Sequence, residues 1–141
     1  MAPTGSAVKR RNTAQKQVIR DTLAALGSHV SAGEIYQKLG ETHPTIGRAT
    51  VFRVLSDMAD DGTLLRIRIP GTDDRFDTTA YPHHHILCRC CGAVNDVWYS
   101  EEPDLTAHIR DTSGFVIENA AILFTGVCES CRRAEHPSDS Q

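Results

Sequence analysis

Two Cys-x-x-Cys pairs, Cys88/Cys91 and Cys128/Cys131, are the residues of this chain with the clearest chemical use. Four thiolates complete one tetrahedral zinc site. A redox-active dithiol is the alternative, but it needs a βαβ context that the surrounding sequence lacks. Three histidines, His83–His85, stand directly before the first pair and exceed what that zinc site needs. The sequence therefore predicts two metal sites, one that holds the chain together and one that senses or reacts.

If the chain is extended over the three histidines, their side chains point in two opposite directions. Side chains alternate along a β-strand, so His83 and His85 would point to one side and His84 to the other. Two imidazoles two residues apart form half of a metal site. The nearby carboxylates are Asp77, before a linker, and Asp96, on the strand expected after the first cysteine pair. Asp96 could therefore lie beside the histidines on the neighbouring strand.

The segment between the two cysteine pairs is 36 residues long. It exceeds the usual zinc-ribbon spacing, so a small subdomain must lie between the pairs. Zinc would then connect the end of that subdomain to its beginning. Cys90 lies between two of the ligands and is interpreted as a bystander thiol.

At 141 residues and 40% hydrophobic content, the chain can form one domain or two small ones. Two small halves would each be marginally stable, and a structural metal or dimerisation would compensate. No N-terminal segment resembles a signal peptide, and no apolar run is long enough to span a membrane. The expected location is therefore the cytosol, where paired cysteines more often bind metal than form disulfides.

Charge is distributed unevenly behind the net charge of −3. Residues 1–80 carry a net charge of +2, and residues 81–141 carry −5. A basic first half suits contact with phosphates. A solvated basic N-terminus explains the same charge equally well.

The first 77 residues have the pattern of three helices followed by a hairpin. Residues 1–11 are small, polar and basic, and we expect them to be disordered. Apolar spacing, a capping box of Ser31 and Glu34, and a Pro-Gly turn mark the elements. The expected elements are helices over 13–26, from Ser31 to Leu39 and from about 45–47 to 60, with strands over 64–69 and 75–77. This order predicts a winged helix-turn-helix domain over residues 1–77.

The pattern changes after a hinge expected at residues 78–82. A second domain is expected over 83–133, followed by a disordered tail over 134–141. Its expected elements are strands His84–Cys88, Val94–Tyr99 and Phe115–Phe124, with a short helix Asp104–Thr112 before the last. The predicted fold class is α+β, a winged helix followed by a small α/β domain with a four-cysteine zinc site.

The third helix is the candidate DNA-reading element. In a recognition helix, threonine or an aromatic ring can touch a thymine methyl, and arginine can reach guanine or phosphate. The candidate contacts are Arg48, Thr50, Phe52 and Arg53, with Arg11 and Lys16 from the basic N-terminus. The alternative interpretation is an ordinary amphipathic helix with surface arginines.

Five segments of the chain together resemble the ferric uptake regulator (Fur) family of dimeric, metal-responsive repressors. They are HVSAGEIYQKL (29–39), RATVFRVL (48–55), RFDT (75–78), HHHILCRCCGAVND (83–96) and GVCESC (126–131). The similarity extends from about Thr13 to Arg132. It implies a winged-helix DNA-binding domain joined to an α/β dimerisation domain.

The resemblance also assigns both metal sites. Structural zinc would be held by Cys88, Cys91, Cys128 and Cys131. The regulatory metal, Fe²⁺ or Mn²⁺, would be held by His29, Asp77, His83, His85 and Asp96. On its position alone His29 would be a capping or surface histidine, and the resemblance makes it a ligand. Because this set comes from both domains, the metal would clasp them together.

Two aspartates indicate the branch of the family. Iron-responsive members usually have glutamate at the positions of Asp77 and Asp96, whereas the peroxide-sensing branch (PerR) has aspartate at both, as here. Three imidazoles and two carboxylates suit Fe(II) or Mn(II) and leave one octahedral position open. In PerR-like proteins peroxide reacts at that Fe(II), and the oxidant damages ligand histidines, which would be His29 and His83. Zinc-sensing members usually have a cysteine ligand where this chain has residues 78–80.

Two positions depart from the family pattern. Many members have a third metal site whose histidines correspond to Pro82 and Ala120. Only His84 and the Glu101–Glu102 pair remain there, so this site is expected to be absent or weak. The recognition helix has Phe52 where the family usually has tyrosine, and the lost hydroxyl contact would change the sequence preference.

The resulting hypothesis is a cytoplasmic, homodimeric repressor that binds a palindromic operator, uses Fe(II) or Mn(II) as corepressor and senses peroxide. It is not expected to be an enzyme or to bind a membrane. The nearest alternative is an iron- or other divalent-metal-responsive uptake regulator without peroxide sensing. A zinc hydrolase or deaminase needs an open zinc position and a general base such as an H-x-E pattern, and neither is visible. A plain zinc-ribbon interaction module would not explain the RATVFR helix.

Overall fold

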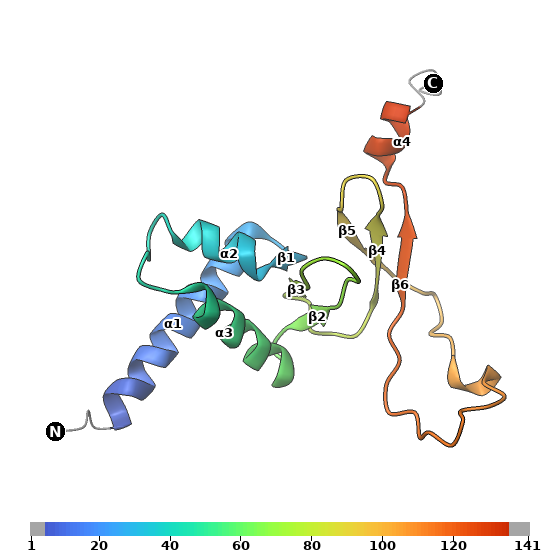
Figure 1. Ribbon diagram of the computed structural model, residues 1–141, viewed down its shortest axis with the longest axis horizontal. Helices are drawn as coiled ribbons and strands as arrows, with labels where there is room; N and C mark the ends of the chain where they lie inside the picture. The colour runs from blue at the N-terminus through green and yellow to red at the C-terminus, as the bar shows by residue number, and fades with distance from the viewer. Residues whose placement is uncertain (1–4, 136–141) are drawn as a thin grey trace. The chain divides into compact units, whose positions relative to one another are not determined.

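The computed structural model describes residues 5–135, with side chains described from Asn12 onward. The chain divides into two compact units, Met1–Pro82 and His83–Gln141. Each unit has a three-stranded sheet of its own (Figure 1).

The first helix, α1 (Gly5–Leu26), begins eight residues before the expected start at Thr13. Residues 5–11, predicted to be disordered, are therefore helical, and residues 1–4 lie outside the described part. The apolar pattern begins only near Val18, but alanine, lysine and arginine favour a helix without apolar contacts. Further along, Ile19 and Leu23 are buried in the core. The helix ends at Gly27, whose φ of 97° suits glycine and whose N–H donates to the carbonyl of Leu23.

The second helix, α2 (Ala32–Leu39), begins at the predicted capping box. The backbone N–H of Glu34 donates to Ser31 Oγ at 3.2 Å, and the N–H of Ser31 donates to Glu34 Oε2 at 2.8 Å. These two bonds satisfy donors that a helix start leaves unpaired. Ile35 and Leu39 lie on the buried face, and Gly40 caps the end.

The third helix, α3 (Arg48–Asp60), follows Gly47 as predicted. Its buried residues are Val51, Val54, Leu55 and Met58, which recur at helical spacing and pack against α1 and α2. The opposite face remains at the surface and includes Arg48, Ala49, Phe52 and Arg53.

The sheet of the first unit has the strand order β1-β3-β2. β2 (Leu65–Ile67) and β3 (Arg75–Asp77) form the expected antiparallel hairpin, and Phe76 of β3 is fully buried in the helical core. β1 (Val30–Ser31) pairs with the free edge of β3. It was not predicted, because two residues are too few to show an alternating pattern.

The sheet of the second unit has the strand order β5-β4-β6. β4 (His84–Cys88) is antiparallel to β5 (Val94–Val97) and parallel to β6 (Leu123–Gly126). The last helix, α4 (Glu129–Glu135), contains the first two residues of the predicted disordered tail. Residues 136–141 of that tail lie outside the described part of the chain.

Two predicted elements of the second unit are wrong in extent. The expected helix Asp104–Thr112 is only a 3-10 turn, η1 (Thr106–His108). The expected strand Phe115–Phe124 is reduced to β6, which begins at Leu123. Residues 101–121 are exposed throughout, including Phe115 at 77% and Val116 at 87%. Apolar alternation stabilises a strand only against a surface that covers it, and none of the described residues of this unit covers the segment.

Candidate metal centres and DNA-contact surface

The four predicted zinc ligands lie together at one end of the second sheet. Their sulfur atoms all lie within 4.8 Å of one another. Cys88 is the last residue of β4, and its ladder partner Gly126 is the last residue of β6, so both strands deliver their cysteine turns to the same end. Gly92, with φ 75°, closes the turn that brings Cys91 back over Cys88.

The electrostatics of this cluster favour a bound cation. The backbone N–H of Cys128 donates to Cys88 Sγ at 3.3 Å, and this bond, with a second from the N–H of Cys91, lowers the pKa of Cys88 to about 6. Hydrogen bonds from the Cys131 thiol to the sulfurs of Cys128 and Cys91 raise the pKa of Cys131, because they hold the proton on its sulfur. A divalent ion would replace this shared proton, and four thiolates in this arrangement suit zinc.

Cys90, the remaining cysteine, is not part of the cluster. Its thiol is exposed, and its Sγ lies 3.8 Å from Glu135 Oε1. Partial desolvation and, to a smaller degree, this carboxylate raise the pKa of Cys90, so its thiol stays protonated and weakly nucleophilic.

The first unit brings together two residues of the predicted regulatory set. His29 Nε2 lies 3.2 Å from Asp77 Oδ2, and the Asp77 side chain is fully buried. The other carboxylate oxygen accepts the backbone N–H of Thr79 at 2.8 Å. Because Val30 pairs with Phe76 in the sheet, the residue before β1 meets the residue after Phe76. His29 also has a φ of 65°, a costly conformation for a non-glycine residue that is typical of functional positions.

The second unit brings together the other three residues of the predicted regulatory set. His83 Nε2 lies 2.7 Å from Asp96 Oδ1, and His85 Nε2 lies 3.4 Å from the same oxygen. His85 and Asp96 are directly opposite in the β4–β5 ladder and therefore share a face. His84 faces the other way, as alternation predicts, with its Nε2 2.7 Å from Glu102 Oε1. In both units, then, an aspartate contacts imidazole nitrogens, a donor type that suits Fe(II), Mn(II) or Zn(II).

The sequence reasoning missed Trp98, whose ring stacks on His83. The ring centroids are 4.5 Å apart, and the planes are inclined by 12°. A signal was present, because Trp98 follows Asp96 by two residues and alternation places both on the face that carries His83.

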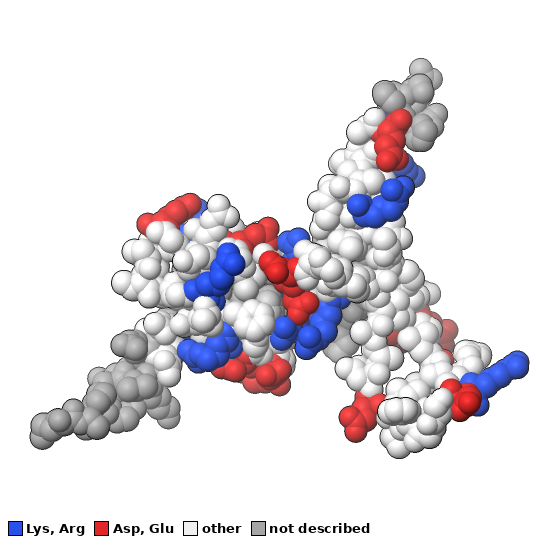
Figure 2. Space-filling model, in the orientation of Figure 1, with Lys and Arg blue, Asp and Glu red and all other residues white. Residues whose placement is uncertain are grey.

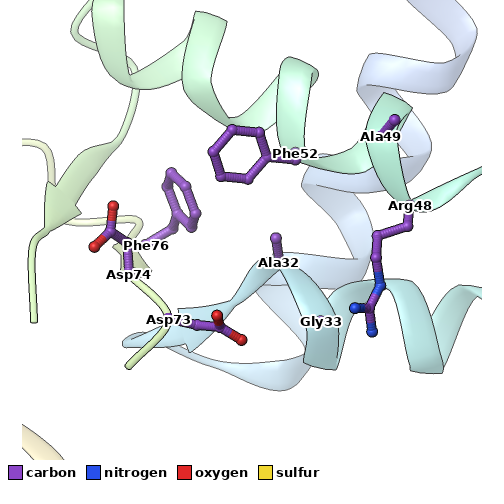
Figure 3. Close-up of a pocket in the computed structure, with 8 residues that line it drawn as sticks. All are labelled: Ala32, Gly33, Arg48, Ala49, Phe52, Asp73, Asp74 and Phe76. Carbon is purple, nitrogen blue, oxygen red and sulfur yellow. The ribbon is translucent and has the colours of Figure 1, made fainter. Parts of the chain in front are cut away.

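A cavity of about 510 Å³ lies beside the exposed face of α3. Figure 3 shows the rings of Phe52 and Phe76 beside each other on one side and Arg48 at the other end. Asp73 and Asp74, from the turn between β2 and β3, complete the rim. The cavity therefore adjoins the surface that the predicted recognition helix would present to DNA.

The predicted DNA contacts differ in how freely they can reach a phosphate. Arg48 and Arg53 are exposed on α3, and Thr50 is half-buried. Lys16 Nζ lies 3.5 Å from Asp61 Oδ2, so its ammonium group already has a counter-charge. The side chain of Arg11 lies outside the described side chains.

The turn between β2 and β3 carries its own ion pairs. Arg66 Nε donates to Asp74 Oδ2 at 2.7 Å, and Arg68 Nη1 lies 3.9 Å from the same oxygen. The Arg66 guanidinium also lies 5.3 Å from the Phe52 ring centroid, which joins β2 to α3. Figure 2 shows basic and acidic side chains interspersed over the first unit. None of the helices described here is long and apolar enough to cross a membrane.

Comparison with known proteins gives a consistent assignment. The model of the ferric uptake regulator family matches residues 7–125. This chain belongs to the ferric uptake regulator family. It is 30% identical over 122 residues to the peroxide-responsive repressor PerR of Staphylococcus epidermidis, an alignment that covers 86% of this chain and 81% of that protein.

Solved structures give the same family fold. The ferric uptake regulator of Pseudomonas aeruginosa, solved with manganese, superposes with a TM-score of 0.59 at 26% identity, covering 81% of this chain and 87% of that one. The Campylobacter jejuni peroxide stress regulator superposes with a TM-score of 0.65 at 20% identity, covering 93% of this chain and 100% of that one, which supports the fold alone. Members of the Fur family are DNA-binding, dimeric transcriptional regulators and not enzymes.

Replacing Cys88 by serine should remove the zinc and destabilise the second unit, because a structural metal contributes folding free energy directly. We expect bound zinc to fall from about one ion per chain to nearly none, with a lower melting temperature. Metal analysis and thermal unfolding measure both effects. Cys90→Ser is the matched control and should retain zinc. A Cys88→Ser protein that keeps its zinc would contradict the assignment.

Proposed function

We propose that this Fur-family protein is a metal-dependent repressor that uses Fe(II) or Mn(II) as corepressor and senses peroxide. The observation that carries the proposal is aspartate at both carboxylate positions, Asp77 beside His29 and Asp96 beside His83 and His85. The 30% identity to peroxide-responsive repressors supports the same assignment.

One metal ion would be bound by ligands from both units. The proposed ligands are His29, Asp77, His83, His85 and Asp96. The donor set of three imidazoles and two carboxylates suits Fe(II) and Mn(II) and leaves a sixth position for peroxide. Bound Fe(II) would supply the redox chemistry, and the ligand histidines His29 and His83 are the proposed targets. The four cysteines would hold a separate structural zinc.

DNA recognition would use the first unit as a winged helix. In this proposal α3 lies in the major groove with Arg48, Thr50, Phe52 and Arg53 toward the bases and phosphates. The hairpin of β2 and β3 would be the wing, and the ion pairs of Arg66 and Arg68 with Asp74 would stiffen it. Arg11 and Lys16 would add phosphate contacts, and Lys16 would exchange Asp61 for a phosphate oxygen.

Dimerisation would use the exposed apolar part of the second unit. Leu105, Ile109, Phe115, Val116 and Ile117 are all exposed in the single chain. Several large apolar side chains exposed within one segment are typical of an interface. A homodimer places two copies of α3 at a fixed spacing, which requires a palindromic operator.

Metal would control DNA binding by fixing the two units of each chain relative to one another. A ligand shifts a conformational equilibrium only by its preference for one state. Here the preferred state is the one in which both half-sites share the ion. Oxidation of His29 or His83 would remove a ligand, release the units and weaken DNA binding.

A second candidate function is a divalent-metal-responsive uptake regulator without peroxide sensing. The similarity to the Pseudomonas aeruginosa ferric uptake regulator, solved with manganese, favours it. The two candidates share the fold, the ligands and the dimer, and they differ only in what peroxide does to the iron form.

Peroxide treatment of the iron form separates the two candidates. The full chain, with its zinc retained, is loaded with Fe(II) or Mn(II) and treated with stoichiometric hydrogen peroxide. Binding is measured on a DNA duplex selected from random sequence with the Mn(II) form. With Fe(II) we expect the Kd for DNA to rise at least about tenfold, a loss of roughly 1.4 kcal/mol, together with oxygen addition at His29 or His83. With Mn(II) we expect neither change. Unchanged DNA binding and unmodified histidines in the iron form would favour the uptake regulator.

Asp77→Glu should preserve metal-dependent DNA binding and reduce the peroxide response. Glutamate retains a carboxylate, but its extra methylene must fit a fully buried position held by His29 and the Thr79 N–H. The yield of oxidised histidine in the iron form measures the response. Asp21→Glu, on α1 and hydrogen-bonded to Gln17, is the matched control. An undiminished response in Asp77→Glu would refute the role given to aspartate.

Phe115→Glu should convert the dimer to a monomer, because association would bury an unpaired charge. Analytical ultracentrifugation should show a mass close to that of one chain, 15.5 kDa. Thr112→Glu, also exposed in the same segment, should remain dimeric and controls for added charge. Retained zinc confirms that each variant is folded. If Phe115→Glu stays dimeric, the interface lies elsewhere.

A further inference from the structure

Trp98 is the single tryptophan of the chain, and it lies directly against a proposed oxidation target. Its ring stacks on His83 with the ring centroids 4.5 Å apart. His83 Nε2 in turn contacts Asp96 Oδ1 at 2.7 Å. The indole is therefore one ring removed from the carboxylate of the proposed regulatory site, and all three residues belong to the second unit.

The neighbouring aromatic residue has a different position. Tyr99 lies edge-on to His84, with the ring centroids 5.0 Å apart and an interplanar angle of 76°. His84 faces Glu102 on the opposite side of the strand from His83. Trp98 and Tyr99 thus form a natural pair for comparison, since they are adjacent in the chain but contact different histidines.

The chemistry of the stacked rings favours oxidation of the indole. An indole ring is richer in electrons and more easily oxidised than an imidazole ring. Two π systems in face-to-face contact exchange an electron readily over so short a distance. An oxidant produced close enough to attack His83 therefore also reaches Trp98, and an electron lost from His83 can be replaced from the indole.

We propose that Trp98 is a second oxidation site of this protein and competes with His83 for the oxidant. The inference rests on the proposed peroxide response and concerns how the oxidant is divided between Trp98 and His83. In the net step the O–O bond of hydrogen peroxide breaks, and one oxygen is inserted into a C–H bond of the indole as a C–OH group. The other oxygen leaves as water. The indole loses two electrons, and the peroxide gains them.

The competition has a regulatory consequence. Each oxidant molecule consumed by Trp98 leaves His83 intact as a ligand. The protein then needs more peroxide to lose its regulatory metal than a chain without this tryptophan would need. Trp98 therefore sets the threshold of the response without being a ligand.

The test compares oxygen addition in the wild type, Trp98→Phe and Tyr99→Phe. Each full-length dimer, with zinc retained, is loaded with Fe(II) or Mn(II), treated with stoichiometric hydrogen peroxide and digested for peptide mass analysis. In the wild type we expect oxygen on Trp98 with Fe(II) and not with Mn(II). In Trp98→Phe a phenyl ring replaces the indole beside His83, and a phenyl ring is harder to oxidise than an indole. If Trp98 and His83 divide equally the oxidant that reaches this stacked pair, this variant should raise the His83 yield about twofold. Tyr99→Phe should leave both yields unchanged.

Four outcomes would overturn the inference. Oxygen on His29 or His83 with none on Trp98 would remove the second site while leaving peroxide sensing intact. Equal oxidation of Trp98 with Mn(II) or without regulatory metal would mean ordinary surface oxidation. An unchanged His83 yield in Trp98→Phe, with zinc content and dimer mass as in the wild type, would remove the competition. Iron-dependent oxygen on no residue would overturn the proposed function as well.

Discussion

The carboxylate of Asp77 is fully buried, and the first unit is built to accommodate that charge. A buried carboxylate costs several kcal/mol unless cations or hydrogen bonds compensate it. Thr79 donates one backbone hydrogen bond, and His29 contacts the other oxygen. The His29 contact requires the short strand β1 to pair with β3 and requires His29 to hold a left-handed backbone. The present contacts of Asp77 supply only partial positive charge. A metal ion bound to its carboxylate would supply a full counter-charge.

The same short strand connects the charge to the helices. Ser31 pairs with Arg75 in the sheet and also caps α2 through Glu34. Arg75 Nη1 donates to Glu34 Oε2 at 3.0 Å, so the strand that carries Asp77 is tied to the first turn of α2. α2 packs on α3 through the common core. A change at the carboxylate therefore has a short, packed route to the exposed face of α3.

The second unit is stabilised in another way. The buried apolar cluster of the described chain belongs to the first unit, whereas the second has few buried side chains, among them Cys88, Val94 and His85. Units with so little core usually need a metal or a partner. The small core of the second unit explains why the sequence predicted β4, β5 and the cysteine turns correctly. It also explains why the helix and strand expected over residues 104–122 were wrong. Alternation and ligand spacing are local signals, whereas a strand over that segment would need a covering surface that the described residues of its unit do not supply. The sequence pattern alone also did not predict His29 as a ligand, because only the family resemblance identified it.

Because Trp98 is the chain's single tryptophan, all of its indole fluorescence comes from the ring stacked on His83. The protein thus carries an intrinsic optical probe in contact with a proposed regulatory ligand. A paramagnetic ion such as Mn(II) on His83 would quench that emission at close range, whereas diamagnetic zinc held by the four cysteines would not. Tryptophan fluorescence of the unlabelled protein can therefore distinguish a paramagnetic ion on His83 from zinc on the four cysteines.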